Sequence, residues 1–322
     1  MNKNVLISIA AGVVNGLFFL GYFTGKPHAV IFTVISTLPL FLVALMRGIG
    51  GTAIAAVAGM VTVAIIHGGI WTSMVGVSFY GALPACVVGY TALRRQVTPG
   101  QQSTVWYPTG FVISWLAVTF ALLFVAWAAL EAIGGVRDAA IGATNGWLST
   151  ISSPMSDQDR HDFARKLAEI APGILAYLWM IGSLAMAGTA QRVLVRLKRN
   201  VRPTRSLATI SLPHWAQWLF GGAIVLRLIG SGDLEYMGNQ LALIFSTPFF
   251  FLGLAVVHMG SRKVRNSRLA LAVFYVAIAM MASTLGLVAG LALAGLGIVG
   301  LGLVEQLVGL RSRFTDQEDW EF

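Results

Sequence analysis

The stretch Leu269–Leu310 reads LALAVFYVAIAMMASTLGLVAGLALAGLGIVGLGLVEQLVGL, and Glu305 is its only formally charged residue. One helical crossing of a bilayer core takes roughly 20 apolar residues, at about 1.5 Å of rise per residue. The stretch has about twice that length, so we expect two transmembrane helices with a tight turn near Gly286–Gly290. The alternative is one long helix buried in a soluble protein, but similar apolar blocks recur along the whole chain.

The composition points the same way. The chain has 322 residues, of which 57% are hydrophobic and 11% are charged, whereas soluble domains carry about 25% charged residues. The net charge of +9 could suggest nucleic acid as a partner. The basic residues, however, cluster at the ends of apolar segments, which is how membrane proteins are oriented. The single cysteine, Cys86, permits neither an intrachain disulfide nor a cysteine-based metal site.

The apolar blocks predict an all-α polytopic transmembrane helix bundle of about ten crossings. The segment 52–66 is short and could be re-entrant. The first block lacks a small-x-small cleavage site, so we interpret it as a retained crossing. We expect one transmembrane domain over residues 1–310 and a cytoplasmic tail over 311–322. The expected crossings are 5–23, 29–46, 52–66, 70–93, 109–132, 173–195, 215–229, 240–259 and two within 269–310.

Charge in the connecting segments predicts the orientation. Short loops rich in lysine and arginine stay in the cytoplasm. With about ten crossings, all the basic segments fall on one side, and both termini are then cytoplasmic. The acidic segments 157–169 and 233–235 fall on the other side. The basic segments are Arg94-Arg95, Arg196–Arg205, Arg262–Arg268 and Arg311–Arg313.

The longest segment that is not expected to span the membrane is 134–171, an extracytoplasmic loop. Ser156 followed by Asp159 resembles a capping box, which predicts the start of a helix. Phe163, Leu167 and Ile170 then share one helical face. We expect a short amphipathic helix that lies on the membrane surface or on neighbouring helices, or else a solvated helix within the loop.

Catalytic motifs are absent from the sequence. It contains no GxxxxGK[ST] nucleotide-binding loop, no HExxH and no GxSxG. None of the five histidines is paired with another ligand at the spacing of a metal site. We therefore expect no enzymatic activity, no catalytic residue, no metal and no cofactor.

Charged residues inside or beside the crossings are the first candidates for a binding site, since a charge in hydrocarbon costs about 2.5–3.5 kcal/mol on insertion scales. Arg227 lies near the outer end of the 215–229 crossing, Asp233 and Glu235 follow in the next loop, and Asn239 opens the next crossing. These side chains could form an outward polar pocket for a small solute. Alternatively, Arg227 snorkels to the interface and pairs with Asp233 or Glu235.

Two further residues are candidates for ligand binding. Asn15 lies deep in the first crossing, between Gly12 and Gly16. It could form an interhelical hydrogen bond or contact a ligand. His258 lies near the cytoplasmic end of its crossing and can reach water.

A family resemblance comes from three short motifs: Leu212-Pro213-His214-Trp215, Asn239, and the run FLGLAVVH at 251–258 before a basic loop. With these motifs the chain resembles the YybS-like family of uncharacterised bacterial membrane proteins. That family is distantly similar to the substrate-binding subunits of energy-coupling-factor transporters. The resemblance implies an outward solute pocket and ATPase subunits supplied in trans. The present chain has more crossings than those subunits, and the family offers no catalytic residue to transfer.

We therefore expect a multi-pass protein of the bacterial inner (plasma) membrane that binds or transports a small solute without an ATPase of its own. The alternative is a membrane scaffold or assembly factor that binds a protein partner through its basic cytoplasmic loops. An enzyme that acts on lipid is a third possibility. The expected partners are the lipid bilayer, whose anionic headgroups the basic loops meet, a small solute, and a partner membrane protein or ATPase.

Overall fold

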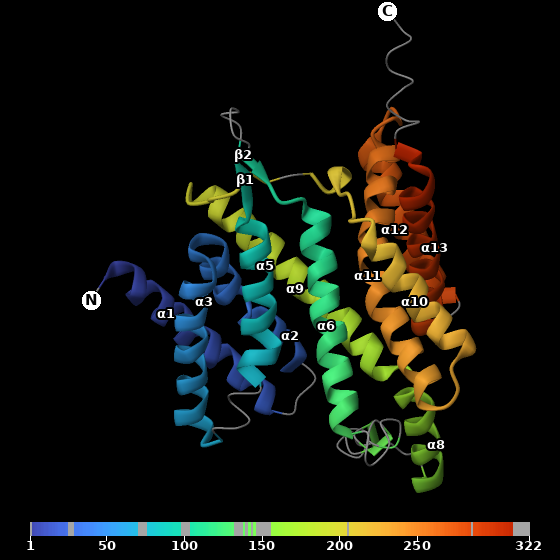
Figure 1. Cartoon of the computed structure of the whole chain (residues 1–322), viewed down its shortest axis with the longest axis horizontal. Helices are drawn as coiled ribbons and strands as arrows, with labels where there is room; N and C mark the ends of the chain where they lie inside the picture. The colour runs from blue at the N-terminus through green and yellow to red at the C-terminus, as the bar shows by residue number, and fades with distance from the viewer. Residues whose placement is uncertain are drawn as a thin grey trace, which may run out of the picture. The chain divides into compact units, whose positions relative to one another are not determined.

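The computed structural model of the chain describes residues 2–24, 29–69, 76–97, 104–131, 138, 141–142, 144–145, 156–204, 206–284 and 286–311. Most of these residues are helical (Figure 1). The helices are α1 (Lys3–Phe19), α2 (Ala29–Ser36), α3 (Leu38–His67), α5 (Leu83–Leu93), α6 (Thr109–Glu131), α8 (Asp157–Ala168), α9 (Ala171–Arg196), α10 (Trp215–Ile229), α11 (Asp233–Ser261), α12 (Ser267–Thr284) and α13 (Leu287–Val308). Short 3₁₀ segments are η1 (Leu20–Thr24) and η3 (Leu207–Thr209), and η2 (Ser78–Ala82) is a π-helix.

Within the described ranges, seven helical segments are long and apolar enough to cross a bilayer. Two shorter apolar helices, Ser78–Leu93 and Trp215–Ile229, accompany them. The predicted all-α membrane bundle is therefore confirmed, while the count of ten crossings stays a prediction. The candidate spans are Lys3–Phe23, Ile31–His67, Thr109–Ala129, Ala171–Arg196, Asp233–Ser261, Ser267–Thr284 and Ala289–Val308.

The division of Leu269–Leu310 into two helices is confirmed. Helix α12 ends at Thr284 and α13 begins at Leu287, and Gly286 between them has a positive φ of 83°. Only 6% of the apolar window of α12 and 17% of that of α13 are buried inside the protein. Apolar side chains in such numbers need a hydrocarbon environment, so both helices present most of their surface to lipid.

The predicted turn at 47–51 is also present. Segment Ile31–His67 has 37 residues, but Gly48 interrupts it with φ 66° and ψ −158°. A Cβ atom on Gly51 would lie 3.0 Å from Val43 Cγ1, whereas eight residues of straight helix would separate these positions by about 12 Å. The chain therefore folds back at Gly48, as two separate crossings require.

Contacts divide the chain into two compact units. Unit 1 comprises Met1–Thr119 and Tyr177–Thr204, and unit 2 comprises Phe120–Ala176 and Arg205–Phe322. The expected single transmembrane domain over 1–310 stays a prediction.

Small residues hold α1 against α3 in unit 1. A Cβ atom on Gly12 would overlap the carbonyl oxygen of Ala55, and one on Gly16 would lie 2.8 Å from the carbonyl oxygen of Gly59. Glycines four residues apart let the two backbones approach closely, as the spacing of Gly12 and Gly16 predicts.

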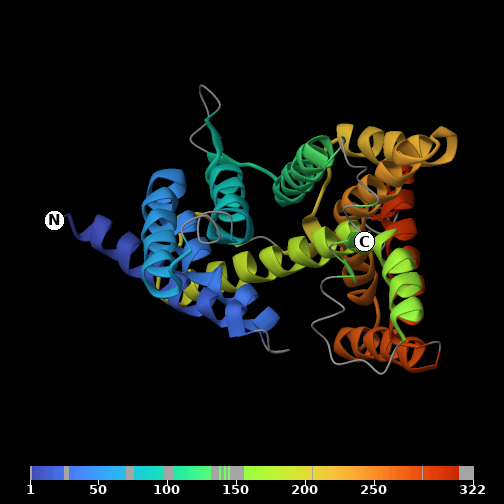
Figure 2. The ribbon, with the colours of Figure 1, turned by 90° about the horizontal axis from the view of Figure 1, so that it is seen from below.

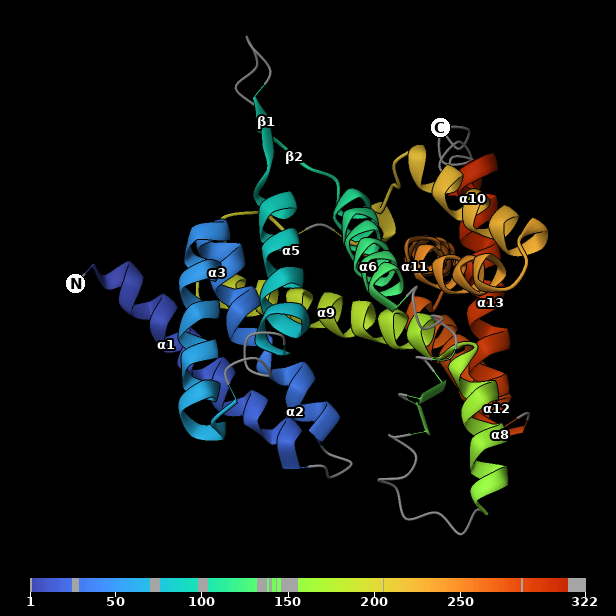
Figure 3. The same cartoon turned by 60° about the horizontal axis from the view of Figure 1, so that its bottom comes forward.

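The segment between α5 and α6, which the sequence suggests is a plain polar loop, contains a β-hairpin. Strand β1 (Arg95–Val97) pairs antiparallel with β2 (Thr104–Trp106), with Arg95 opposite Trp106. The two strands β1 and β2 extend beyond the end of α5 (Figure 3). Three-residue strands have too little alternation for a sequence pattern to reveal them.

Helix α8 begins as predicted but packs through a different face. Ser156 is its N-cap, and the Ser156 hydroxyl accepts a hydrogen bond from the Asp159 amide at 3.1 Å. The buried positions are Ala164 and Ala168, whereas Phe163 and Ile170 are 43% and 40% exposed. Leu167 is half-buried, so only Phe163 and Ile170 of the expected apolar face are exposed. That this face lies on the membrane surface or on neighbouring helices stays a prediction.

Replacing Gly12 with leucine should destabilise unit 1, because the new side chain meets the Ala55 carbonyl and forces α1 away from α3. Overpacking of this kind costs about 1–3 kcal/mol. Thermal unfolding in detergent should show a lower midpoint for Gly12→Leu. The matched control is Val14→Leu, at an exposed position of the same helix, and an equal loss in both variants would contradict this packing.

Candidate functional site

The charged candidates Arg227, Asp233 and Glu235 lie at one end of the α10–α11 hairpin. Arg227 is in the last turn of α10, and Asp233 and Glu235 are in the first turn of α11. The two acids are therefore helical, and the expectation that they lie in a loop is wrong, because α11 begins seven residues before the predicted crossing at 240. All three side chains are exposed.

These charges are not joined into a polar cluster. Among the described residues, no ion pair or hydrogen bond links Arg227 to Asp233 or Glu235. Acids at a helix N-terminus and a base at a helix C-terminus are stabilised by the helix dipoles, typically by about 0.3–1 kcal/mol each. The three side chains thus have a sufficient structural reason for their positions. Asn239 is one turn further along α11 and is half-buried.

The residue beside Asn239 has the strongest polar role at this end of unit 2. Gln240 is fully buried and holds the junction of α8 and α9, where the chain turns (Figure 2). Its Oε1 accepts from the Gly173 amide at 2.7 Å, and its Nε2 donates to the Glu169 carbonyl at 2.6 Å. One amide thereby satisfies an orphan carbonyl at the end of α8 and an orphan N–H at the start of α9.

Tyr236 supports the same junction from one turn earlier on α11. Its hydroxyl donates to the Ala168 carbonyl at 3.0 Å. In the sequence, Gln240 marks only the first residue of the predicted crossing 240–259. The signal that could have revealed the clamp is the i, i+4 spacing of Tyr236 and Gln240, which places two polar side chains on one face of an otherwise apolar helix.

Replacing Gln240 with leucine should destabilise unit 2, because the Gly173 amide and the Glu169 carbonyl both lose their partner. Each unsatisfied buried group costs about 1–3 kcal/mol. The matched control is Asn239→Leu, since no described residue forms a hydrogen bond with that neighbouring amide. Thermal unfolding in detergent should show a large loss for Gln240→Leu alone, and equal losses would contradict the clamp.

Asn15 has a comparable role in unit 1, with one difference. It is 1% exposed in the middle of α1, and its Nδ2 donates to the Ser36 carbonyl, the last residue of α2, at 2.7 Å. The expected interhelical hydrogen bond is therefore present. Its Oδ1, by contrast, has no hydrogen-bond partner among the described residues.

The helices around Asn15 are interrupted. Helix α1 continues into the 3₁₀ turn η1, α2 ends at Ser36 just before Thr37, and the π-helix η2 contains Gly81. A Cβ atom on Gly59 would lie 2.7 Å from Asn15 Oδ1, and one on Gly81 would lie 3.7 Å from Asn15 Nδ2. The backbone therefore packs closely against this amide, and a side chain at position 59 would collide with it. Short π-helical segments are frequent at functional sites.

His258 does not join either group. Its Nδ1 lies 2.8 Å from the Leu254 carbonyl of the preceding turn, and its ring is 6.3 Å from that of Tyr275 on α12. Asn239 and His258 are 19 residues apart on α11, or about 28 Å along the helix axis. Asn239 and His258 therefore do not share one binding site. Asn15 belongs to the other unit.

Three of the basic residues outside the spans form hydrogen bonds inside the protein. In unit 1, Arg202 is buried, and its guanidinium donates to the Ala92 carbonyl in the last turn of α5 and to Thr109 Oγ1 at the start of α6, each at 3.2 Å. The segments that carry Arg94-Arg95 and Arg202 are thus at the same end of unit 1, as the charge pattern predicts.

In unit 2, Arg311 has the equivalent role. It forms an ion pair with Glu305 at 2.7 Å and donates to the carbonyls of Ala208 and Ile210, at 2.6 and 2.7 Å. Arg262 donates to the Ser206 hydroxyl at 2.9 Å. The basic ends of α11 and α13 therefore meet the segment 206–210 around η3, while Tyr236 and Gln240 hold the acidic segments together at the other end.

Within the described part of the chain, no three histidine, cysteine or acidic side chains gather as a metal site would require. These observations define a multi-pass, all-α membrane protein with buried polar side chains at its helix ends. The chain belongs to the family described as "Predicted membrane protein (DUF2232)", which matches residues 13–296. This confirms the expected membership of an uncharacterised family of polytopic membrane proteins. No curated protein and no solved structure matches the chain significantly.

Proposed function

We propose that the protein binds a small polar solute within the membrane and takes part in its transport, with Asn15 as the contacting residue. The supporting observation is the Asn15 side chain, which is 1% exposed while its Oδ1 lacks a partner among the described residues. An unpaired buried acceptor costs about 1–3 kcal/mol. A hydrogen-bond donor on a solute would remove this cost.

The backbone around Asn15 supports the same proposal. Non-helical backbone at membrane depth is tolerated only where protein buries it or where it lines a cavity. In transporters, interrupted helices commonly form the substrate site near the middle of the membrane. In unit 1, the 3₁₀ turn η1 follows α1, and Gly81 of the π-helix η2 lies beside the Asn15 amide, whereas Thr37 keeps helical angles of φ −75° and ψ −19°.

The exposed residues Arg227, Asp233 and Glu235 are weaker candidates, because the dipoles of α10 and α11 already explain their positions. We place the protein in the bacterial inner (plasma) membrane. The sequence has no nucleotide-binding loop, so any ATP-driven step would be supplied in trans by another subunit.

The test is a thermal-shift screen of detergent-purified protein against water-soluble vitamins, amino acids, nucleosides and sugars. A ligand of the native state raises the free energy of unfolding by about 2.7 kcal/mol at a concentration of about 100 Kd. At least one compound should stabilise the wild type. Asn15→Leu, which removes the amide but keeps the side-chain size, should lose that stabilisation. Its own unfolding midpoint should be lower, because the Ser36 carbonyl loses its donor, but the variant should still fold.

Two control variants make this screen specific. Ser183→Ala removes another buried polar atom that has no partner among the described residues, and it should keep the response. The double variant Arg227→Ala/Glu235→Ala should also keep it. The proposal fails if no compound stabilises the wild type, or if its ligands stabilise Asn15→Leu equally well.

A membrane scaffold remains the second candidate, and one observation favours it. A Cβ atom on Gly295 or Gly300 of α13 would meet nothing within 4 Å. Smooth surfaces of this kind suit the docking of a helix from another membrane protein. The basic loops are less suited to this role than their charge suggests, because Arg202 and Arg262 already have partners inside the protein.

A further inference from the structure

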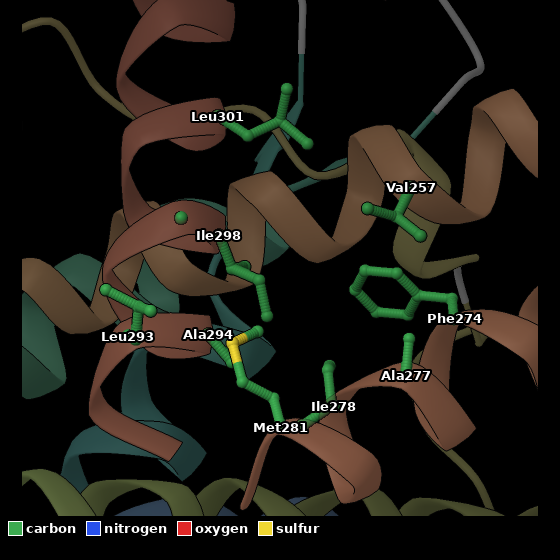
Figure 4. Close-up of a pocket in the computed structure, with 10 residues that line it drawn as sticks. Val257, Phe274, Ala277, Ile278, Met281, Leu293, Ala294, Ile298 and Leu301 are labelled. Atoms are coloured by element: carbon green, nitrogen blue, oxygen red, sulfur yellow. The ribbon is translucent and has the colours of Figure 1, made fainter. Parts of the chain in front are cut away.

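An apolar groove opens between α11, α12 and α13 in unit 2. Its volume is about 260 Å³. Figure 4 shows its side chains converging from the three helices, with Phe274 and Met281 at different levels of α12. The groove is lined by Val257 of α11, by Phe274, Ala277, Ile278 and Met281 of α12, and by Leu293, Ala294, Gly297, Ile298 and Leu301 of α13.

The size and lining of the groove restrict what can occupy it. Sites for drug-sized ligands have roughly 300–1,000 Å³ and include a few polar groups. This groove is smaller, and every residue that lines it is apolar. It therefore suits part of a hydrocarbon chain better than a polar solute. Figure 1 shows α11, α12 and α13 side by side. The lining residues extend from Phe274 to Met281 on α12 and from Leu293 to Leu301 on α13, so the groove runs along these helices.

A basic turn lies beyond one end of the groove. The turn Arg262–Arg268 joins α11 to α12, and Arg265 and Arg268 are exposed and form no ion pair with any described residue. Phe274 is six residues after Arg268, about 9 Å along α12, and Met281 is about 20 Å along it. The groove thus begins about 9 Å from a cationic surface and continues deeper into the membrane-spanning part of the helices.

We propose that this groove and turn form a binding site for one anionic phospholipid, with an acyl chain in the groove and the phosphate group beside Arg265 and Arg268. The two parts match a phospholipid in order and in chemistry: apolar lining deep in the membrane, and positive charge at its surface. Basic pockets at the ends of transmembrane helices bind anionic headgroups in this way. A docked helix of another protein would not need the exposed arginines, which is why we favour lipid as the occupant.

Gly297 provides the sharpest test. It lines the groove, and a Cβ atom there would meet nothing within 4 Å. A phenylalanine can therefore enter the groove without displacing another residue at its Cβ. Gly295 is the matched control, because a Cβ atom there also meets nothing within 4 Å and the residue does not line the groove.

The experiment is photo-crosslinking of the full chain in phosphatidylcholine vesicles that carry a trace of probe lipid with a diazirine in its acyl chain. The probe is either phosphatidylglycerol or phosphatidylcholine, and labelled peptides are identified by mass spectrometry. In the wild type, phosphatidylglycerol should label the α12 and α13 peptides more strongly. Gly297→Phe should lose this labelling, and Gly295→Phe should keep it.

The double variant Arg265→Gln/Arg268→Gln should reduce the preference for phosphatidylglycerol by about 25-fold, because basic residues near the surface each contribute roughly fivefold. The control Arg196→Gln/Arg199→Gln removes the same charge from another exposed segment and should not change the preference. Since all four arginines are exposed, both charge variants should fold, and they decide the question if Gly297→Phe fails to fold.

Three results would overturn the proposal. The first is equal labelling of the wild type by the phosphatidylglycerol probe and the phosphatidylcholine probe. The second is unchanged labelling in Gly297→Phe, which would leave the groove without a role. The third is competition by soluble glycerol phosphate, or crosslinking of groove residues to a second protein chain in place of lipid, since either would identify a different occupant.

Discussion

Backbone groups at the ends of helices have no intrahelical partners, and within a bilayer they have no water to bind either. The structure meets this constraint with long polar side chains that reach from one helix to the end of another. Asn15 donates to the last carbonyl of α2, Arg202 to the last turn of α5, and Gln240 to the carbonyl that follows α8. All three side chains are buried, where an unmade hydrogen bond is most costly.

This constraint also explains why polar residues in this protein are few and not interchangeable. Gln240 uses both ends of its amide, so its acceptor and its donor are satisfied together. Asn15 uses only its donor, and the acceptor is left over. In Gln240 the fold satisfies both polar groups of the amide, whereas in Asn15 one acceptor stays available for a ligand. The exposed charges of the α10–α11 hairpin belong to neither class.

Much of the fold could be predicted from the sequence because hydrocarbon thickness fixes the length of a crossing. The division between α12 and α13 follows from apolar length alone. What could not be predicted depends on tertiary contacts. On α8, Ala164 and Ala168 are buried while Phe163 is exposed. This could not be predicted, because a hydrophobic pattern does not show how closely two helices pack. The early start of α11 was missed because Asp233 and Glu235 suggest a loop, although acids suit a first helical turn.

The candidate site was less predictable than the fold. The sequence located Asn15 inside a helix, but not its partner Ser36, which is 21 residues away. Charge suggested Arg227 as a ligand contact, although a helix end accounts for it. Charge was more informative for the connecting segments. Within each unit, contacts of Arg202 or Arg311 bring basic segments together at one end, which is the arrangement that the positive-inside rule predicts.

The most direct test of this account is cysteine accessibility in sealed vesicles of known orientation. In a Cys86→Ser background, single substitutions Arg199→Cys, Arg265→Cys and Ser231→Cys place one thiol in each of three exposed connecting segments. The account predicts that a membrane-impermeant maleimide labels positions 199 and 265 from the same side and position 231 only from the opposite side. Labelling of 199 and 265 from opposite sides, or of 231 together with them, would contradict it.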